Sequence, residues 1–293
     1  MRNSAIRRIN NAVRRLDMVL LKDVLNPPDG SDGAPFELCA VTRDDWKRYV
    51  RSELQEMGSC WMTWWDDRVF IVELPETLHE SLVGDVREAI IEATGTRRTH
   101  LLDYGKQHFD YIPTFPDDIN DLLGHLEPDS SFRGLPGAVL PPDFIWEEFN
   151  TLKVEIGVYR CWGDRIPQEG QRFLTLNETA NAWRQCPGVE YVLSIRVDCS
   201  LAVREYRLDS IVDGEFEDPE MQHAPIETDT VVQFDSWRLL AIPHGANLPP
   251  GFNDSVQFNL FDVVNPIIQR QRRYLADHQA HAGQPPRRRQ RRH

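Results

Sequence analysis

Three ionisable residues near the middle of the sequence, Asp129, Lys153 and Glu155, are of the types that support phosphodiester hydrolysis. Asp129 follows a proline in the segment EPDSSF, and Glu155 comes 26 residues later in the segment TLKVEIGV. Mg²⁺ prefers oxygen ligands and is commonly held by one or two carboxylates together with waters and substrate phosphates. Asp129 and Glu155 are therefore candidate ligands for Mg²⁺ or Mn²⁺, and the Lys153 ammonium is a candidate for orienting water or stabilising phosphate charge.

The segment that carries two of these residues has the pattern of a β-strand. Side chains alternate across a strand, so Lys153 and Glu155 share one face while Val154 and Ile156 share the other. We expect residues 152–158 to lie inside a mixed sheet, with the two apolar residues buried and Glu155 facing a cleft. An antiparallel strand with one wet face, on which both charges simply meet water, is the alternative.

The elements around this strand predict a single α/β or α+β domain, in which helices flank a mixed central sheet. Periodicity and end signals predict helices and strands in turn along the chain. The predicted helices span residues 43–58, 77–95, 174–185 and 266–279, and the predicted strands span residues 68–76, 151–158, 189–198, 201–209, 230–243 and 255–264. We expect residues 104–137 to be rich in loops.

The ends of the chain differ in composition from this body. Residues 1–35 are expected to form a basic helix and a linker, because five arginines and no acid occur in the first fifteen residues and Pro, Gly and Asp fill residues 25–35. Residues 36–278 are expected to form the domain, and residues 279–293 a disordered arginine-rich tail.

Composition and charge limit the function classes. The chain carries 46 acidic and 33 basic side chains, a net charge of −13, so most of its surface is unsuited to holding polyanions. Five cysteines without a C-x-x-C pair indicate reduced thiols and an intracellular protein, nuclear or cytoplasmic. The arginine-rich N-terminus overlaps with a mitochondrial presequence, but a short surface helix is the simpler interpretation. No apolar run approaches the roughly 20 residues that span a bilayer, which argues against a membrane protein.

Other possible sites have simpler structural explanations. The cysteines lack zinc spacing, and the glycines form no phosphate-binding loop. Trp61, Trp64 and Trp65 are expected in a core or at its edge rather than stacked on bases, because basic neighbours are lacking. His79 and Glu80 lie at the start of the helix predicted over residues 77–95. The first turn of a helix favours acidic residues for electrostatic reasons, so both residues are interpreted as structural.

Several of these segments together resemble the PD-(D/E)XK nuclease superfamily. The Pro128–Asp129 pair, the strand VEIG, the helix ETANAW and the following strand GVEYVLSI are similar to the superfamily core, and more narrowly to the Uma-type branch of restriction endonucleases. The resemblance covers roughly residues 68–207. It implies a restriction-endonuclease-like fold and a Mg²⁺-dependent nuclease acting on DNA, with Asp129 and Glu155 as metal ligands.

The sequence departs from that superfamily at the basic position. A lysine is expected two residues after the acidic one, but Gly157 stands there. Lys153, on the same strand face as Glu155, and Arg160 are the candidates to replace it. The alternative is a catalytically degenerate module of the same fold that binds protein or nucleic acid. A third hypothesis is an unrelated structural interaction protein whose Lys153 and Glu155 are ordinary surface charges.

Deletion of residues 287–292 tests the basic tail, which contains five arginines in that stretch. An arginine run repels itself and joins no core, so we expect the tail to contact phosphates or direct nuclear import. The truncated chain should therefore bind DNA with a weaker salt dependence, measured by fluorescence anisotropy over a salt series. Unchanged salt dependence together with unchanged cellular distribution would exclude this role.

Overall fold

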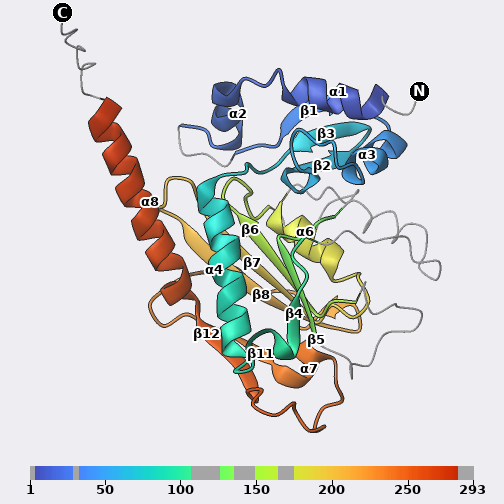
Figure 1. The fold of residues 1–293 in the computed structure, drawn as a ribbon, viewed down its shortest axis with the longest axis vertical. Helices are drawn as coiled ribbons and strands as arrows, with labels where there is room; N and C mark the ends of the chain where they lie inside the picture. Colours follow the sequence, from blue (N-terminus) through green and yellow to red (C-terminus); the bar gives the residue numbers. More distant parts are fainter. Residues whose placement is uncertain (1–3, 29–32, 107–125, 135–148, 164–174, 283–293) are drawn as a thin grey trace, which may run out of the picture.

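The protein has a mixed α/β fold, seen in a computed structural model that describes residues 4–28, 33–106, 126–134, 149–163 and 175–282 (Figure 1). These residues include seven α-helices, a seven-stranded mixed sheet and two smaller antiparallel sheets. The helices are α1 (Ser4–Val13), α2 (Met18–Leu25), α3 (Arg43–Val50), α4 (Thr77–Ala93), α6 (Leu176–Trp183), α7 (Ser236–Leu240) and α8 (Leu260–Ala282), with short 3₁₀ turns η1 (Ser59–Trp61) and η2 (Arg97–Thr99).

The strands fall into three sheets. The first contains β1 (Phe36–Ala40), β2 (Met62–Trp65) and β3 (Arg68–Ile71), in the order β1-β3-β2. The central sheet contains β4 (Leu101–Asp103), β5 (Ser130–Gly134), β6 (Leu152–Gly157), β7 (Tyr191–Val197), β8 (Arg204–Val212), β9 (Glu215–Phe216) and β10 (Ala224–Pro225). The third pairs β11 (Val231–Asp235) with β12 (Ser255–Asn259).

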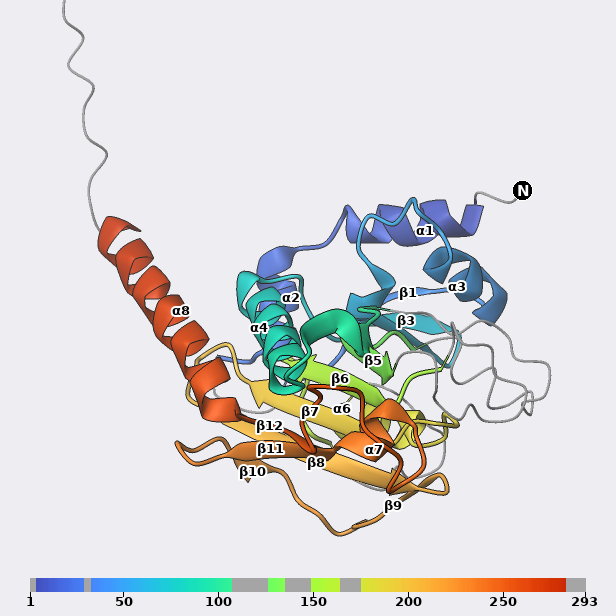
Figure 2. The same ribbon diagram turned by 60° about the horizontal axis from the view of Figure 1, so that its bottom comes forward.

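The N-terminal helices belong to the same hydrophobic cluster as the first sheet. Ile9 of α1 and Leu21 of α2 are fully buried in a cluster with Trp46 of α3 and Val69 of β3. Figures 1 and 2 show α1, α2 and α3 gathered around this small sheet, at one end of the molecule. The helices that precede residue 35 therefore pack on the small sheet that follows it.

The central sheet places β6 between an antiparallel and a parallel neighbour. Its strands follow the order β10-β8-β7-β6-β5-β4, with β9 paired to β8. Strand β6 runs antiparallel to β5 and parallel to β7. A parallel pair needs a crossover connection, and α6 lies on the chain between β6 and β7. The expected mixed sheet flanked by helices is confirmed, and the strand predicted over residues 151–158 is confirmed as β6.

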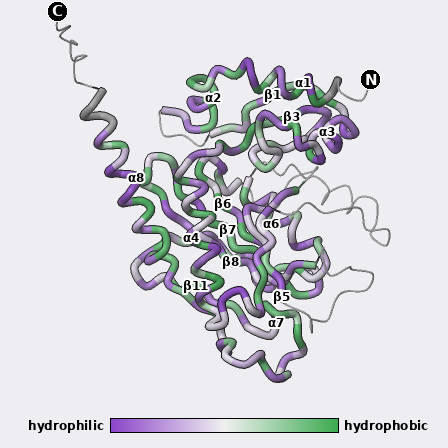
Figure 3. Tube along the Cα trace, viewed as in Figure 1, coloured by the Kyte–Doolittle hydropathy of each residue, from purple (hydrophilic) through white to green (hydrophobic). Residues whose placement is uncertain are grey.

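The two faces of β6 meet different surroundings. Leu152, Val154 and Ile156 are fully buried in the main core, which also contains the apolar faces of α4 and α8. Figure 3 shows hydrophobic and hydrophilic residues interleaved along α4, as a helix with one buried face requires. The opposite face of the sheet packs on α6, where Trp183 is fully buried. Lys153 and Glu155 therefore lie on the side of α6.

Several predicted boundaries differ from the structure. The helix predicted over residues 77–95 is confirmed as α4, but the strand predicted over residues 230–243 is wrong beyond Asp235. The side chain of Asp235 accepts a hydrogen bond from the Arg238 backbone N–H, and this N-cap starts α7. The loop-rich expectation for residues 104–137 missed β5. The tail expected over residues 279–293 is wrong at its start, because α8 continues to Ala282, and residues 283–293 lie outside the described residues.

The long helix at the C-terminal end leaves the body of the molecule. α8 begins at Leu260, earlier than predicted, and includes Pro266 in its first two turns. Its first half packs along α4, and its second half projects away from the sheet (Figure 1). In the described part of the chain, α8 and the other helices are each too short or too polar to cross a bilayer.

Truncation of Leu193 tests the apolar face of the central sheet. This residue is fully buried on β7, so Leu193→Ala should lower the free energy of unfolding by about 2 to 5 kcal/mol, measured by urea denaturation. Leu54→Ala serves as the control, because Leu54 is 68% exposed and its truncation should change stability by less than about 0.5 kcal/mol. Equal losses for both variants would contradict the described packing.

Candidate carboxylate site

The two carboxylates singled out from the sequence converge in the structure. Asp129 lies directly before β5, where its backbone N–H donates to the Val154 carbonyl of β6 at 3.2 Å. Glu155 is in the middle of β6. Nη2 of Arg160 lies 3.3 Å from Oδ2 of Asp129 and 3.1 Å from Oε2 of Glu155. One guanidinium nitrogen thus bridges the two carboxylates, whose residues are 3% and 1% exposed.

The other contacts of the carboxylates come from three separate elements. Asp129 Oδ1 lies 3.3 Å from Nε2 of His79 on α4, and its Oδ2 accepts from the Ile156 backbone N–H at 2.7 Å. Glu155 Oε1 accepts from the indole Nε1–H of Trp183 on α6 at 2.6 Å. With the bridging guanidinium, each of the four carboxylate oxygens therefore has a nitrogen partner. Glu155 lies in an enclosed polar cluster rather than facing the cleft that was expected.

Lys153 shares the strand face of Glu155 and is fully buried. Its Nζ lies 4.8 Å from the ring centroid of Trp183. Burial disfavours the charged ammonium and lowers the pKa of Lys153 to about 8, although Cys186 and Glu155 oppose this shift. Arg160, which was the second candidate to replace the missing lysine, is the cation that contacts both carboxylates.

Two further buried residues, Glu73 and His79, belong to this cluster. Glu73 is fully buried, and its carboxylate accepts from the backbone N–H groups of Val158 at 2.8 Å and Tyr159 at 3.1 Å. His79, interpreted as structural, is fully buried, with its ring 4.6 Å from the Trp61 ring in an edge-on arrangement. Glu73 ends an apolar strand-like run. An acidic residue in such an apolar segment is the sequence signal that could have indicated a buried carboxylate here.

Lys106 contacts the Trp61 ring, which in turn packs against His79. Nζ of Lys106 is 3.2 Å from Sγ of Cys60, 4.2 Å from the Trp61 ring centroid and 3.8 Å from Oε1 of Glu80. Burial raises the pKa of the Cys60 thiol to about 12, although Lys106 acts in the opposite direction. The thiol is therefore a neutral neighbour of this lysine. Trp61 is 5% exposed, in agreement with its expected place in a core or at its edge.

The environment pushes the pKa values of the two carboxyl groups apart. Burial alone would raise the pKa of Asp129, but the charges of His79 and Arg160 outweigh it, and the pKa falls below its ordinary value. For Glu155, burial is the largest influence and Asp129 adds repulsion, so its pKa rises to about 7 although Arg160 opposes the shift. Asp129 is thus the firmly ionised partner, and Glu155 changes its charge near neutral pH.

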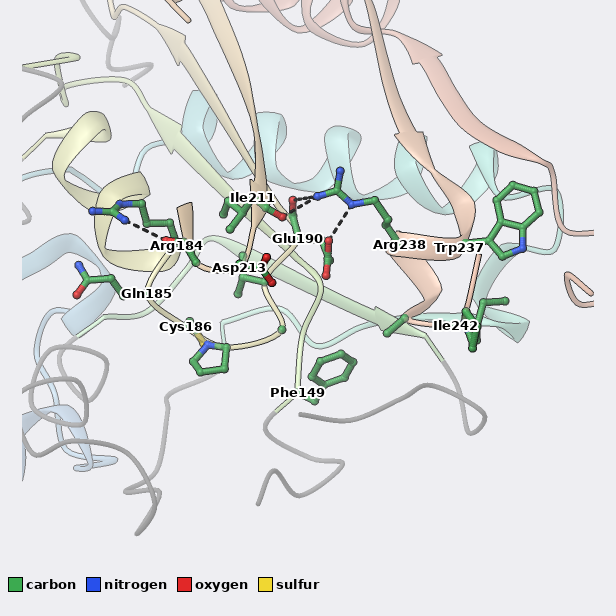
Figure 4. A pocket seen from close by; sticks show the side chains of 16 residues that line it. Phe149, Arg184, Gln185, Cys186, Glu190, Ile211, Asp213, Trp237, Arg238 and Ile242 are labelled. Atoms are coloured by element: carbon green, nitrogen blue, oxygen red, sulfur yellow. Dashed lines mark hydrogen bonds and ion pairs between the residues drawn. The ribbon is translucent and has the colours of Figure 1, made fainter. Parts of the chain in front are cut away.

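The largest of the described cavities lies elsewhere. Figure 4 shows this cavity of about 820 Å³, whose lining includes Arg184, Glu190, Ile211 and Arg238. Arg238 bonds to Glu190 and to the Ile211 carbonyl, so it joins α7 to the sheet. A smaller cavity of about 210 Å³ reaches Arg160. Neither cavity is lined by the paired carboxylates.

The residues as packed do not fit a Mg²⁺ ion. Mg²⁺ needs carboxylate oxygens at about 2.1 Å, but a guanidinium nitrogen stands between Asp129 and Glu155. Oε1 of Glu155 already accepts from the Trp183 indole N–H, and Oδ1 of Asp129 lies 3.3 Å from Nε2 of His79. Within the described ranges, no group of three or more His, Cys, Asp and Glu side chains is placed to hold a metal ion. The arrangement instead stabilises two buried carboxylates through an internal cation.

The pH dependence of stability tests the environment of Glu155. The folded pKa of about 7 lies above the ordinary 4.5, so ionising Glu155 costs the folded state increasingly as pH rises through this window. Glu155→Gln cannot ionise, and its stability relative to wild type should therefore increase from about pH 4.5 to about pH 7, measured by urea unfolding. Glu215→Gln is the control, because its side chain is 78% exposed. A difference between Glu155→Gln and wild type that stays constant with pH would contradict the described burial.

Comparisons of the chain with protein-family models, with curated proteins and with solved structures found no match.

Proposed function

We propose that this chain is a restriction-endonuclease-like domain that binds DNA without cleaving it. The order of elements supports the nuclease-like part of the proposal. Helix α4 precedes β4, β5 and β6, α6 follows, and β7 pairs with β6 in parallel. The acidic residues come just before β5 and within β6, in the order that the superfamily resemblance implies.

The proposal that the protein does not cleave DNA rests on position 157, where there is no room for a lysine. A Cβ atom added to Gly157 would lie 2.9 Å from the Arg160 carbonyl oxygen and 3.2 Å from Cδ1 of Leu176. The first contact is with backbone, so a lysine there requires the turn after β6 to move. Lys153 is directed to the Trp183 ring instead, and the cation between the carboxylates is a guanidinium, which does not release a proton near neutral pH.

The outer half of α8 supports DNA as the ligand. Arg273 is exposed on this half, which projects from the body (Figure 1). Arg270 and Arg272 are also exposed, but Arg270 pairs with Asp85 of α4 at 3.5 Å and Arg272 donates to the Leu201 carbonyl at 2.8 Å. The arginine-rich tail follows them in the sequence. Arginines bind phosphates and release counterions, whereas the acidic body repels DNA. Binding should therefore be confined to this end of the molecule and depend strongly on salt.

A Mg²⁺-dependent nuclease is the second candidate. The convergence of Asp129 and Glu155 on one nitrogen atom favours this candidate. These two residues are the metal ligands that the resemblance implies. Lys153 would be the basic residue in this case. This candidate requires Arg160 to move away from both carboxylates.

Parallel binding and cleavage assays separate these functions. We expect labelled duplex DNA to bind in anisotropy measurements, while plasmid and single-stranded DNA stay intact with Mg²⁺, Mn²⁺ or chelator. Arg270→Gln/Arg273→Gln should weaken binding and reduce the slope of log affinity against log salt by about 0.9 for each phosphate that is no longer neutralised. The control Arg48→Gln/Arg68→Gln removes two exposed arginines from the N-terminal unit and should change binding little.

Two other results would redirect the assignment. Metal-dependent cleavage that disappears in Asp129→Asn and in Glu155→Gln would establish the nuclease. A chain that neither binds nor cleaves DNA would be better explained as a structural interaction protein.

A further inference from the structure

Arg160 lies between the two carboxylates that the resemblance implies as metal ligands. We infer that the Arg160 guanidinium occupies a divalent-cation position, and that removing its charge converts Asp129 and Glu155 into a binding site for hard cations such as Mg²⁺ and Mn²⁺. This inference deepens the proposed non-cleaving function and rests on it for its biological meaning. Its test measures metal binding alone, so it can fail or succeed independently of DNA binding.

The backbone after β6 explains how the arginine reaches this position. The chain turns back after Gly157, and the absence of a side chain there lets the Arg160 backbone approach the strand. Nη2 of Arg160 also donates to the Ile156 carbonyl at 3.2 Å. The guanidinium is thus fixed over the strand by the fold itself, with the residue only 7% exposed.

The local charge explains why a cation is needed. Asp129 and Glu155 are almost fully buried, and Glu73 also acts electrostatically on Arg160. Burying carboxylates without compensation is strongly unfavourable, and removing one member of a buried ion pair is a large destabilisation. Without the guanidinium, the negative charge of the two carboxylates would be uncompensated, and a bound divalent ion could compensate it.

The remaining contacts hold the carboxylates in place when Arg160 is absent. The backbone N–H of Ile156 fixes Asp129, and the indole N–H of Trp183 fixes Glu155. Neither contact depends on Arg160. An entering ion would therefore meet two oriented oxygen ligands, with waters completing its coordination.

Arg207 provides a matched control on the same sheet. It is 3% exposed on β8, and its Nε pairs with the carboxylate of Asp209 at 2.8 Å. Arg207→Met and Arg160→Met both remove a buried guanidinium from an acidic protein. Arg160→Met leaves two carboxylates that converge on one point, so a cation site should arise in this variant and not in Arg207→Met.

Terbium luminescence measures the new site directly, because excited indole sensitises a nearby Tb³⁺ ion and Trp183 contacts Glu155 at 2.6 Å. Arg160→Met should bind Tb³⁺ at least about tenfold more tightly than wild type or Arg207→Met, a change equivalent to about 1.4 kcal/mol. Mg²⁺ and Mn²⁺ should displace the Tb³⁺ and raise the melting temperature of this variant. Adding Asp129→Asn should abolish the gain. Equal Tb³⁺ binding by wild type and Arg160→Met would overturn the inference.

Folding of the variants provides a second measurement. If Arg160→Met is unfolded without metal, divalent ions should restore its circular dichroism spectrum, and Arg160→Met/Asp129→Asn/Glu155→Gln should fold without any metal because the charges are gone. A triple variant that stays unfolded would show that Arg160 acts by packing, and would overturn the inference. An Arg160→Met protein that no divalent ion folds, beside a folded triple variant, would overturn it equally.

Discussion

The guanidinium of Arg160 between Asp129 and Glu155 is the interaction on which the centre of this fold depends. Two carboxylates from neighbouring strands lie in a region nearly closed to water, where their mutual repulsion is weakly screened. A single nitrogen atom contacts an oxygen of each. The sheet can therefore keep β5 and β6 paired at this point, because the charge that their pairing brings together is compensated at the same place.

Strand β6 lies between two hydrophobic clusters, and its charged side chains all face the one on the side of α6. Val154 and Ile156 meet the large core under α4, whereas Lys153 and Glu155 meet α6 on the other side. A shift of one residue in the register would exchange these faces and place both charges in the apolar core. Trp183 is suited to this border, because its ring packs near the Lys153 ammonium while its N–H group binds Glu155. The polar cluster thus helps to specify the register of the strand.

The sequence alone could predict the elements whose signals are local. Alternation along residues 152–158 predicted the strand and its buried apolar face but not the burial of Lys153 and Glu155. Helical spacing in residues 77–95 predicted α4, including Gly95 at φ +77° just after its end. Glu73 was not found because its role depends on backbone contacts 85 and 86 positions away, and the contact between His79 and Asp129 is also non-local. The run of residues 230–243 was assigned to one strand because its apolar content continues across the Asp235 cap, which ends β11 and starts α7.

The glycine at position 157 and the position of Arg160 depend on each other. The Arg160 carbonyl can approach β6 only because position 157 has no Cβ, and this approach directs the guanidinium to the carboxylates. A lysine at position 157 would need the space of that turn and would push Arg160 away. The site can accordingly hold a lysine beside an open pair of carboxylates, or a glycine with an arginine that bridges them, but the same backbone cannot provide both. This exclusion ties the glycine at position 157 to the internal cation, and it explains how two acidic residues can stay buried side by side without a metal ion.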